Sequence, residues 1–504
     1  MFKHASLRAI AGWIEQCRTQ AKSLPIPAMS KGRQRFPLSP AQFRIWFVEH
    51  LQTFSSDYNM PFALRILGEF DPAVARKALQ KMLEKHQILR TVYQQCEQKN
   101  VVEQVILEDV ELRVQALDIR NIVSDQKEST LKEIVQQEAS TPFSLDLEIP
   151  IRCSIITVEP NQWVLLITLH HIACDGWSLE LLEKDFLEFY TMTEPDMSLA
   201  DVASQIQYSD YALWQQEQLI SERFVDKQTF WREYLADAPL LHSLPQQKQL
   251  NVAQQATAKI ITRQVSSQST ESGRGYCDRQ DITPFMFLYG LFGIAVSHFS
   301  HQKDVVVGTP FSNRTHQDVH KLVGCFVNTL PIRIQCENNA AFASFWQDTR
   351  AKVLQVQEHQ DFPFESIVDL VNPPRDSQTS PIFQILFTYQ QAPVNAQATA
   401  LPFELEPLDA NFIPAANKYE ITIDITDDNS ELWISVAYDQ RRYSEGFINR
   451  LLDYYHTLIE QVPRVDAQLS IGTLMNNVQM SRDNGFNLST DTFEKGQFCC
   501  VEDL

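Results

Sequence analysis

The chain has 504 residues, and its 63 acidic and 43 basic residues leave a formal net charge of −20. This acidity argues against a nucleic-acid or anionic-membrane surface, since both are bound through Lys and Arg. With 44% hydrophobic and 21% charged residues, the composition is that of a globular protein with a sizeable core. Neither G-x-x-x-x-G-K-[ST] nor G-x-G-x-x-G occurs, so nucleotide chemistry is not expected on this chain.

The nine cysteines are odd in number and form no C-x-x-C pair. We therefore expect reduced thiols in the cytoplasm rather than a disulfide framework or a structural zinc site. No signal-peptide pattern opens the chain, and the longest apolar run, 284–296, is shorter than the roughly 20 residues of a membrane helix. His316 and His320 are four residues apart without a third ligand nearby, so an exposed helix face is favoured over a metal site.

The first half of the chain mixes helical and strand patterns. An amphipathic helix over 5–22 is followed by a linker over 23–35 that contains proline, glycine and basic residues. Further helices are predicted over 40–51, 71–86 and 178–190, and strands over 62–66, 152–158 and 163–169. The strand over 163–169 is apolar without alternation, which is typical of a strand that is buried on both faces.

The second half repeats this mixture at a similar scale. Helices are predicted over 284–299, 342–358 and 444–461, and strands over 304–307, 326–334, 382–389 and 432–438. The chain is therefore expected to be an α/β protein with one lobe over 36–205 and another over 206–470. Residues 471–504 lose periodicity and are interpreted as a polar tail.

The sharpest pattern is HHIACDGWS over 170–178, which directly follows the buried strand over 163–169. An imidazole at such a strand end, His171 above all, can face a cleft and act near neutral pH. Asp175 either relays a proton with a histidine or pairs with an arginine and locks the loop. Gly176 permits a sharp turn or a close approach to substrate, and the helix that begins near Ser178 offers amide groups to an oxyanion.

Two neighbours of His171 are interpreted more conservatively. His170 alone is expected to be a structural histidine, because most histidines on such strands are satisfied within the core. Cys174 is interpreted as a small filler rather than a nucleophile.

The pattern resembles the HHxxxDG motif of condensation domains of nonribosomal peptide synthetases. Seven motifs similar to those of this family occur in order along the chain. They lie at 39–46 (SPAQFRIW), 85–93 (KHQILRTVY), 170–176 (HHIACDG), 208–215 (YSDYALWQ), 307–314 (VGTPFSNR), 326–330 (FVNTL) and 359–365 (HQDFPFE). One short motif would be a weak signal, whereas seven in order are very specific.

The resemblance implies a fold of two chloramphenicol-acetyltransferase-like lobes that form a V-shaped pseudo-dimer around a central tunnel. It implies that an acceptor amine attacks a donor thioester to form an amide. His171 would be the principal catalytic residue, which either deprotonates or orients the amine. Asp175 would be structural and paired with Arg314 or, as second choice, with Arg90. The remaining site or motif residues that the resemblance implies are His170, Gly176, Trp177, Ser178, Thr309, Pro310, Asn328 and His359.

The chain departs from the family pattern at three places, where Lys85, Gln87 and Asn313 replace Arg, Glu and Gly. These changes are expected to alter side-chain packing or the lining of the tunnel rather than to abolish activity. The Trp177-Ser178 pair fits domains that take an L-configured donor, or starter domains that take an acyl donor.

The resemblance also implies partners. Upstream and downstream carrier domains would deliver substrates on phosphopantetheine arms, an adenylation domain would be a neighbour, and the chain itself would bind no cofactor, metal, nucleic acid or membrane. Residues 1–35 resemble the end of a carrier domain plus a linker, and a monomer is expected.

Carrier domains are usually acidic, as this chain is, so their docking is expected to use local basic residues. The candidates are Lys31, Arg33, Arg35, Arg441 and Arg442. A free-standing acyltransferase with a soluble acceptor and a non-catalytic docking module remain as alternatives.

Overall fold

The computed structural model describes residues 25–29, 32–51, 55–96, 101–192, 206–247, 258–373, 379–391, 401–408, 412 and 418–476. The predicted helix over 5–22, the basic residue Lys31 and the end of the predicted tail, 477–504, lie outside these stretches.

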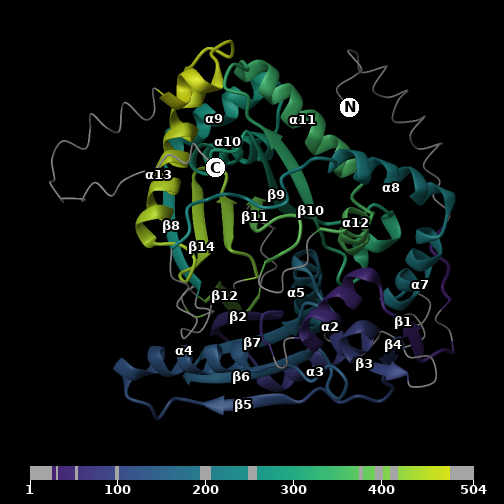
Figure 1. Ribbon diagram of the computed structural model, residues 1–504. Coiled ribbons are helices and arrows are strands. Elements are labelled where there is room, and N and C mark those ends of the chain that lie inside the picture. The colour runs from purple at the N-terminus through teal and green to yellow at the C-terminus, as the bar shows by residue number, and fades with distance from the viewer. Residues whose placement is uncertain are drawn as a thin grey trace, which may run out of the picture.

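The first lobe is built on a five-stranded sheet, the lower layer of Figure 1. In sheet order the strands are β12 (Phe403–Pro407), β2 (Asn59–Gly68), β7 (Gln162–His170), β6 (Ile151–Glu159) and β5 (Val114–Asp118). All neighbours are antiparallel except β5 and β6. Helices α3 (Pro72–Lys85) and α5 (Gly176–Thr191) pack on each other and form one core with the sheet, while α4 (Ser124–Ser140) packs in a separate core with β2 and β7.

The central strand β7 is buried on both faces, as predicted. Leu165 and Leu169 belong to the core under α3 and α5, whereas Val164 and Leu166 belong to the core under α4. Because successive side chains of a strand point to opposite faces, only a continuous apolar run can fill both cores. This strand carries His170 at its end and therefore gives the predicted active-site loop a rigid origin.

The second lobe is built on a six-stranded sheet that one helical layer covers (Figure 1). In sheet order its strands are β10 (Asn328–Gln335), β9 (Asp304–Phe311), β11 (Ile385–Gln391), β13 (Ile421–Asp427), β14 (Leu432–Asp439) and β8 (Ala258–Val265). The covering helices are α9 (Ser267–Gln280), α10 (Pro284–Ser300), α11 (Phe342–Glu358) and α13 (Glu445–Gln461).

The remaining elements flank the two large sheets. A small sheet contains β1 (Arg35–Pro37), β4 (Val101–Ile106) and β3 (Thr91–Cys96). The other helices are α2 (Pro40–Leu51), α7 (Tyr208–Leu219), α8 (Glu222–Tyr234) and α12 (Phe364–Val371), with short helical turns η1 (Gln87–Arg90), η2 (Gln317–Lys321) and η4 (Val462–Arg464). In Figure 1, α2, α7 and α12 lie where the two lobes meet.

Three features correct the predicted division of the chain. Strand β12 comes from the second half but pairs with β2 of the first lobe, so the contiguous ranges 36–205 and 206–470 do not separate the sheets. The tail does not begin at 471, because the helical residues Ile471 and Leu474 are buried in the second core. The predicted linker is not detached either: Ile26 is buried, and its amide donates to Asp318 Oδ2 at 3.0 Å.

No single helix among the described residues is long and apolar enough to cross a membrane. Helices α9 and α10 reach that composition only as a pair bent by 101°, and α10 is the central helix of the second core.

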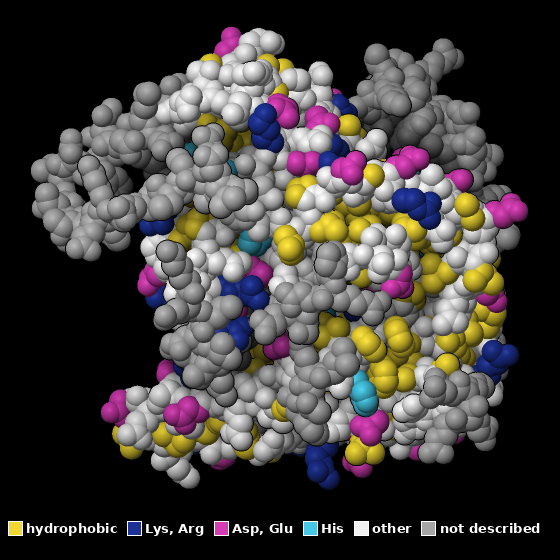
Figure 2. All heavy atoms as spheres, viewed as in Figure 1, with side chains coloured by type: hydrophobic (Ala, Val, Ile, Leu, Met, Phe, Trp, Pro, Cys, Tyr) yellow, Lys and Arg dark blue, Asp and Glu magenta, His cyan; other side chains and the backbone are white. Residues whose placement is uncertain are grey.

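Hydrophobic side chains gather on the molecular face shown in Figure 2, over the region that α2, α8 and α12 occupy. Phe43 and Phe47 of α2 are 49% and 48% exposed, and their rings stack with centroids 6.0 Å apart. Val225 of α8 is exposed as well.

Gly68 is required where β12 joins the first lobe. Its φ is +123°, and a Cβ placed there would lie 2.8 Å from the Pro402 carbonyl oxygen. We expect Gly68→Ala to lower the free energy of unfolding by at least about 1 kcal/mol, because alanine is strained at this φ and would push β12 away. Urea unfolding monitored by circular dichroism measures the change.

Gly446→Ala is the matched control, because a Cβ at this helical position meets only the end of the Arg450 side chain at 3.8 Å. This control should be neutral or stabilising. Equal stability of Gly68→Ala and the wild type would contradict the proposed role of Gly68.

Candidate active site

The predicted active-site loop begins where β7 ends. His170 is opposite Asn59 of β2, and the next amide, that of His171, donates to the Tyr58 carbonyl at 2.9 Å. A turn follows in which the Ala173 amide donates to the His170 carbonyl, and α5 then starts with Asp175 as its N-cap. The loop is therefore fixed by sheet pairing at one end and by helix capping at the other.

The His170 side chain is buried and turned into the first lobe. Its Nδ1 accepts the Ile172 amide at 3.2 Å, so Nε2 carries the proton and donates to Glu49 Oε1 at 2.7 Å. The ring also meets the Phe143 ring edge-on, with centroids 5.6 Å apart. Both nitrogens of His170 are thus used within the protein.

His171 is only partly buried, and its ring meets the Tyr58 ring edge-on with centroids 6.4 Å apart. Desolvation lowers its pKa well below the usual 6.5, and the neighbouring Lys418 and His170 side chains lower it further, whereas a backbone hydrogen bond at Cys174 acts in the opposite direction. The imidazole is therefore neutral at physiological pH, which leaves one ring nitrogen able to accept a proton or a hydrogen bond.

Asp175 is a buried carboxylate that connects the two lobes. Its Oδ1 accepts from the Ser178 amide at 2.8 Å, the Ser178 hydroxyl at 2.7 Å and Arg314 Nη2 at 3.0 Å. Its Oδ2 accepts from the Phe326 amide at 3.1 Å. Since Arg314 and Phe326 come from the second half of the chain, this one side chain joins the loop to the opposite lobe.

The structure contains the ion pair of Asp175 with Arg314, the first of the two predicted partners. Arg314 Nη1 also donates to the Val319 and Leu322 carbonyls at 2.6 and 2.7 Å, and its guanidinium lies over the Phe326 ring at 4.1 Å. The second choice, Arg90, donates to the Leu107 carbonyl instead. Arg90 was a weaker candidate because it ends η1, outside the loop.

The residues after Asp175 have different surroundings. Gly176 has no positive φ and a Cβ there would meet no atom within 4 Å, so the expected sharp turn is not the reason for this glycine. Trp177 is 45% exposed, and its Nε1 donates to the His320 carbonyl at 3.1 Å. Ser178 is buried, and its hydroxyl lies 3.0 Å from both the amide and the carbonyl oxygen of Gly324.

Several motif residues converge on this loop from the first lobe. Gln42 Nε2 lies 3.4 Å from the Ile172 carbonyl and donates to the Tyr93 hydroxyl at 3.1 Å. Ser39 and Tyr208 share a hydrogen bond at 2.8 Å, and Tyr208 also donates to the Cys325 carbonyl at 2.6 Å. Gln42 thus contacts the loop directly, whereas Ser39 and Tyr208 connect the starts of α2 and α7 to the segment at Cys325.

Other motif residues lie away from His171 and maintain the second lobe. Asn328 Nδ2 donates to the Gln360 and Phe362 carbonyls, and its Oδ1 accepts the Phe364 amide, so this side chain holds the turn before α12. Thr309 and Pro310 pair with β10 within the sheet. His359 caps α11 and stacks on the Phe230 ring at 3.7 Å.

Two of the three departures from the family pattern have structural explanations. Lys85 retains a positive charge and pairs with Asp185 at 2.6 Å. Nothing in the structure explains Gln87, whose backbone amide donates to the Gln207 side chain and whose buried Oε1 has no hydrogen-bond partner. Asn313 has a φ of +53°, a conformation that asparagine tolerates better than other non-glycine residues. Only Asn313 adjoins the active-site arginine, Arg314.

Two further sequence hypotheses concern cysteine and metal chemistry. Burial raises the pKa of Cys174 well above its usual value, which fits a filler rather than a nucleophile. His316 is buried rather than on an exposed helix face, and its Nδ1 accepts the Asp318 amide. Among the described stretches of the chain, no group of three or more His, Cys, Asp or Glu side chains is placed to hold a metal ion.

Sequence reasoning did not single out a group of charged residues near the loop. Arg44 Nε of α2 lies 3.6 Å from Glu365 Oε1 of α12, and its Nη2 donates to the Tyr419 hydroxyl at 3.4 Å. Lys418 Nζ lies 4.4 Å from the centroid of the Tyr58 ring. Arg44 and Glu365 do occur in two of the recognised motifs, whereas no motif signalled Lys418.

The comparisons with known proteins agree on one family. The family model of the condensation domain matches residues 32–476. Malpinin synthetase of Mortierella alpina is 30% identical over 471 residues, which are 93% of this chain and 6% of that protein. Tyrocidine synthase 3 of Brevibacillus parabrevis is 28% identical over 467 residues, 92% of this chain and 7% of that protein. The chain thus spans less than a tenth of the length of these relatives.

Solved structures confirm the predicted fold class. The X-domain from teicoplanin biosynthesis superposes with a TM-score of 0.76 at 20% identity, covering 89% of this chain and 98% of its own. The four-domain nonribosomal peptide synthetase AB3403 has a TM-score of 0.75 at 22% identity, covering 88% of this chain and 34% of its own. With the family model matching most of its length, the chain belongs to the condensation domain family.

Proposed function

We propose that this chain forms an amide bond between a donor acyl or peptidyl thioester and the amine of an acceptor. Both substrates would arrive on phosphopantetheine arms of separate carrier domains of a nonribosomal peptide synthetase, in the cytoplasm, and a neighbouring adenylation domain would activate them. The observation that carries the proposal is the neutral, partly accessible His171 at the end of β7. The chain would act as a monomer.

In the proposed reaction, the acceptor nitrogen attacks the thioester carbonyl carbon. The C–N bond forms, the C–S bond breaks, and the proton that the amine loses ends on the departing thiolate. A neutral His171 can accept a hydrogen bond from the amine, orient its lone pair, and take the proton as the intermediate forms. The low pKa of His171 makes it a weak base toward the free ammonium, so orientation is the role favoured here.

Asp175 would be structural, not a proton relay. Both of its oxygens are occupied by donors from Ser178, Arg314 and Phe326, and the ring nitrogens of the histidines appear in none of these contacts. Its negative charge balances Arg314, which is itself buried. This pair fixes the position of His171 between the lobes.

The docking of carrier domains would not use the basic residues first considered at the end of β14. Arg441 pairs with Asp439 at 2.7 Å, and Arg442 pairs with Glu420 at 3.1 Å. Arg35 is 3.6 Å from Glu103. These three charges are already paired within the chain, so the exposed Arg33 and the exposed apolar side chains Phe43 and Phe47 are the better candidates for docking.

A second candidate function is a non-catalytic recruiting module. One of the solved structures with this fold is a complex of the X-domain and OxyB from teicoplanin biosynthesis, with a TM-score of 0.75 at 21% identity. The intact loop around a neutral His171 favours catalysis for this chain. A free-standing acyltransferase would instead give equal rates with a soluble amine and with the carrier-bound acceptor.

The first prediction concerns His171. With two loaded carriers as substrates, His171→Ala should reduce amide formation by at least about 10²-fold, the loss expected when the attacking amine is no longer held in place. Mass spectrometry of the acceptor carrier measures the product. His456→Ala on α13 is the matched histidine control and should keep the wild-type rate. Undiminished turnover in His171→Ala would exclude the proposed role.

The second prediction concerns the pair of Asp175 and Arg314. Asp175→Ala and Arg314→Met should each lower the free energy of unfolding by about 3–5 kcal/mol, because each leaves an uncompensated buried charge. The double variant should lose less than the sum of the two. Urea unfolding of the four proteins completes the cycle, and strict additivity would mean that the two side chains do not interact.

The third prediction concerns the donor. The Trp177-Ser178 sequence leads us to propose an L-configured or plain acyl donor. In competition between carriers loaded with L- and D-configured donors of the same residue, the L-form should be consumed first. Preferential use of the D-form would overturn this assignment while leaving amide formation itself intact.

A further inference from the structure

Lys418 and His171 lie against the same tyrosine. The ammonium group of Lys418 is 4.4 Å from the centroid of the Tyr58 ring, a distance at which a cation is attracted to the ring face. The edge-on contact of the same ring with His171 has centroids 6.4 Å apart, and the Tyr58 carbonyl accepts the His171 amide. Tyr58 thus places a cation from the second lobe beside the imidazole of the first.

The charged groups around these two side chains come from four parts of the chain. His171 is influenced by Lys418 and His170. Desolvation and then the nearby Arg44 lower the pKa of Lys418 to about 8, against the opposing effects of Asp57, the Cys325 thiol and Glu49. A pKa of about 8 leaves Lys418 mostly protonated at pH 7, so His171 has a positive neighbour under working conditions.

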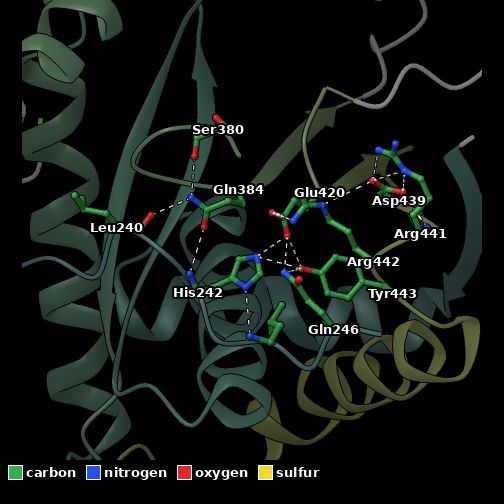
Figure 3. A network of polar contacts seen from close by, with 11 residues as sticks. Leu240, His242, Gln246, Ser380, Gln384, Glu420, Asp439, Arg441, Arg442 and Tyr443 are labelled. Atoms are coloured by element: carbon green, nitrogen blue, oxygen red, sulfur yellow. Dashed lines mark hydrogen bonds and ion pairs between the residues drawn. The ribbon is translucent and has the colours of Figure 1, made fainter. Parts of the chain in front are cut away.

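A polar network holds Glu420, two residues after Lys418 (Figure 3). Glu420 Oε2 accepts from the Tyr443 hydroxyl at 2.6 Å and lies 3.3 Å from His242 Nε2, while Oε1 pairs with Arg442 at 3.1 Å. The Glu420 amide donates to the Gln384 carbonyl at 3.0 Å. Glu420 therefore has little freedom to move.

Tyr419, between Lys418 and Glu420, is tied to the opposite lobe through the hydrogen bond from Arg44. The segment 418–420 is thus fixed from both lobes.

We propose that Lys418 is a positioning residue of the active site, whose ammonium group adds to desolvation in favouring the neutral, hydrogen-bond-accepting state of His171. A like charge nearby disfavours protonation of an imidazole. The catalytic meaning of this charge rests on the proposed amide-forming function. The charge effect itself is a property of the unliganded protein and can be tested without any substrate.

The direct test is a titration of His171 by NMR. The full chain is labelled with ¹³Cε1-histidine, and the His171 signal is identified as the one that disappears in His171→Gln. In the wild type this signal should remain that of a neutral ring well below pH 6.5. In Lys418→Met its midpoint should move to higher pH, because a positive charge that disfavours protonation of the ring is gone.

Two variants separate charge from packing. Lys418→Arg keeps the cation and should titrate like the wild type. Lys259→Met removes a lysine of the outer strand β8 that pairs with Glu445 of α13. This variant should leave the titration midpoint of His171 unchanged. Circular dichroism verifies that each variant is folded, and Lys418→Gln replaces Lys418→Met if the latter does not fold.

An unchanged His171 midpoint in a folded Lys418→Met or Lys418→Gln protein overturns the inference, as does an equal shift in Lys259→Met. If the amide-forming function holds, the acid limb of the kcat/KM profile should move to higher pH in Lys418→Met and return in Lys418→Arg. If no variant forms amide, the proposed function fails while the NMR result still decides the role of Lys418.

Discussion

The carboxylate of Asp175 is the interaction on which the rest of the active site depends. It is buried where the two lobes meet, and its two oxygens accept four hydrogen bonds from Ser178, Arg314 and Phe326. Burying this charge is costly, and the cost is offset only because Arg314 and two backbone amides surround it with short, charge-assisted bonds. Any relative movement of the lobes would break these bonds, so the carboxylate fixes both the loop and the lobe arrangement around it.

The loop that Asp175 holds carries two imidazoles with different roles. His171 is accessible to a substrate, whereas His170 is hydrogen-bonded within the protein through both ring nitrogens. His170 uses both nitrogens within the first lobe, on Glu49 and on the Ile172 amide. His171 lies in the turn after β7, where desolvation and the Lys418 cation favour its neutral form. The two adjacent histidines therefore have separate tasks. The first histidine stabilises the loop and the second is available to a substrate.

Polar motif residues in this fold mostly hold backbone segments in place. Gln42 and Tyr93 reach the Ile172 carbonyl, and Asn328 binds three backbone groups of the turn before α12. Buried backbone groups need such partners where no strand or helix supplies them. The Glu420 network extends the same principle to the segment that carries Lys418 (Figure 3). Motif residues of this kind hold the loops in their conformation and need not touch a substrate.

The sequence by itself determined much of this arrangement. The apolar run of β7 predicted a buried strand that ends at the HHIACDG pattern. The seven motifs in order carried the family resemblance, which implied two lobes, a catalytic His171 and Arg314 as partner of Asp175. These features depend on residues that are close along the chain or on a recognisable motif. Strand β13 was overlooked although its alternating ITIDITD pattern is visible.

Only the tertiary structure decided that β12 joins the first lobe, that Arg442 pairs with Glu420, and that Lys418 is a neighbour of His171. Each of these facts is a meeting of segments far apart in sequence. Local periodicity carries no information about such meetings, because the free energy that selects them comes from packing and charge pairing between the two folded lobes.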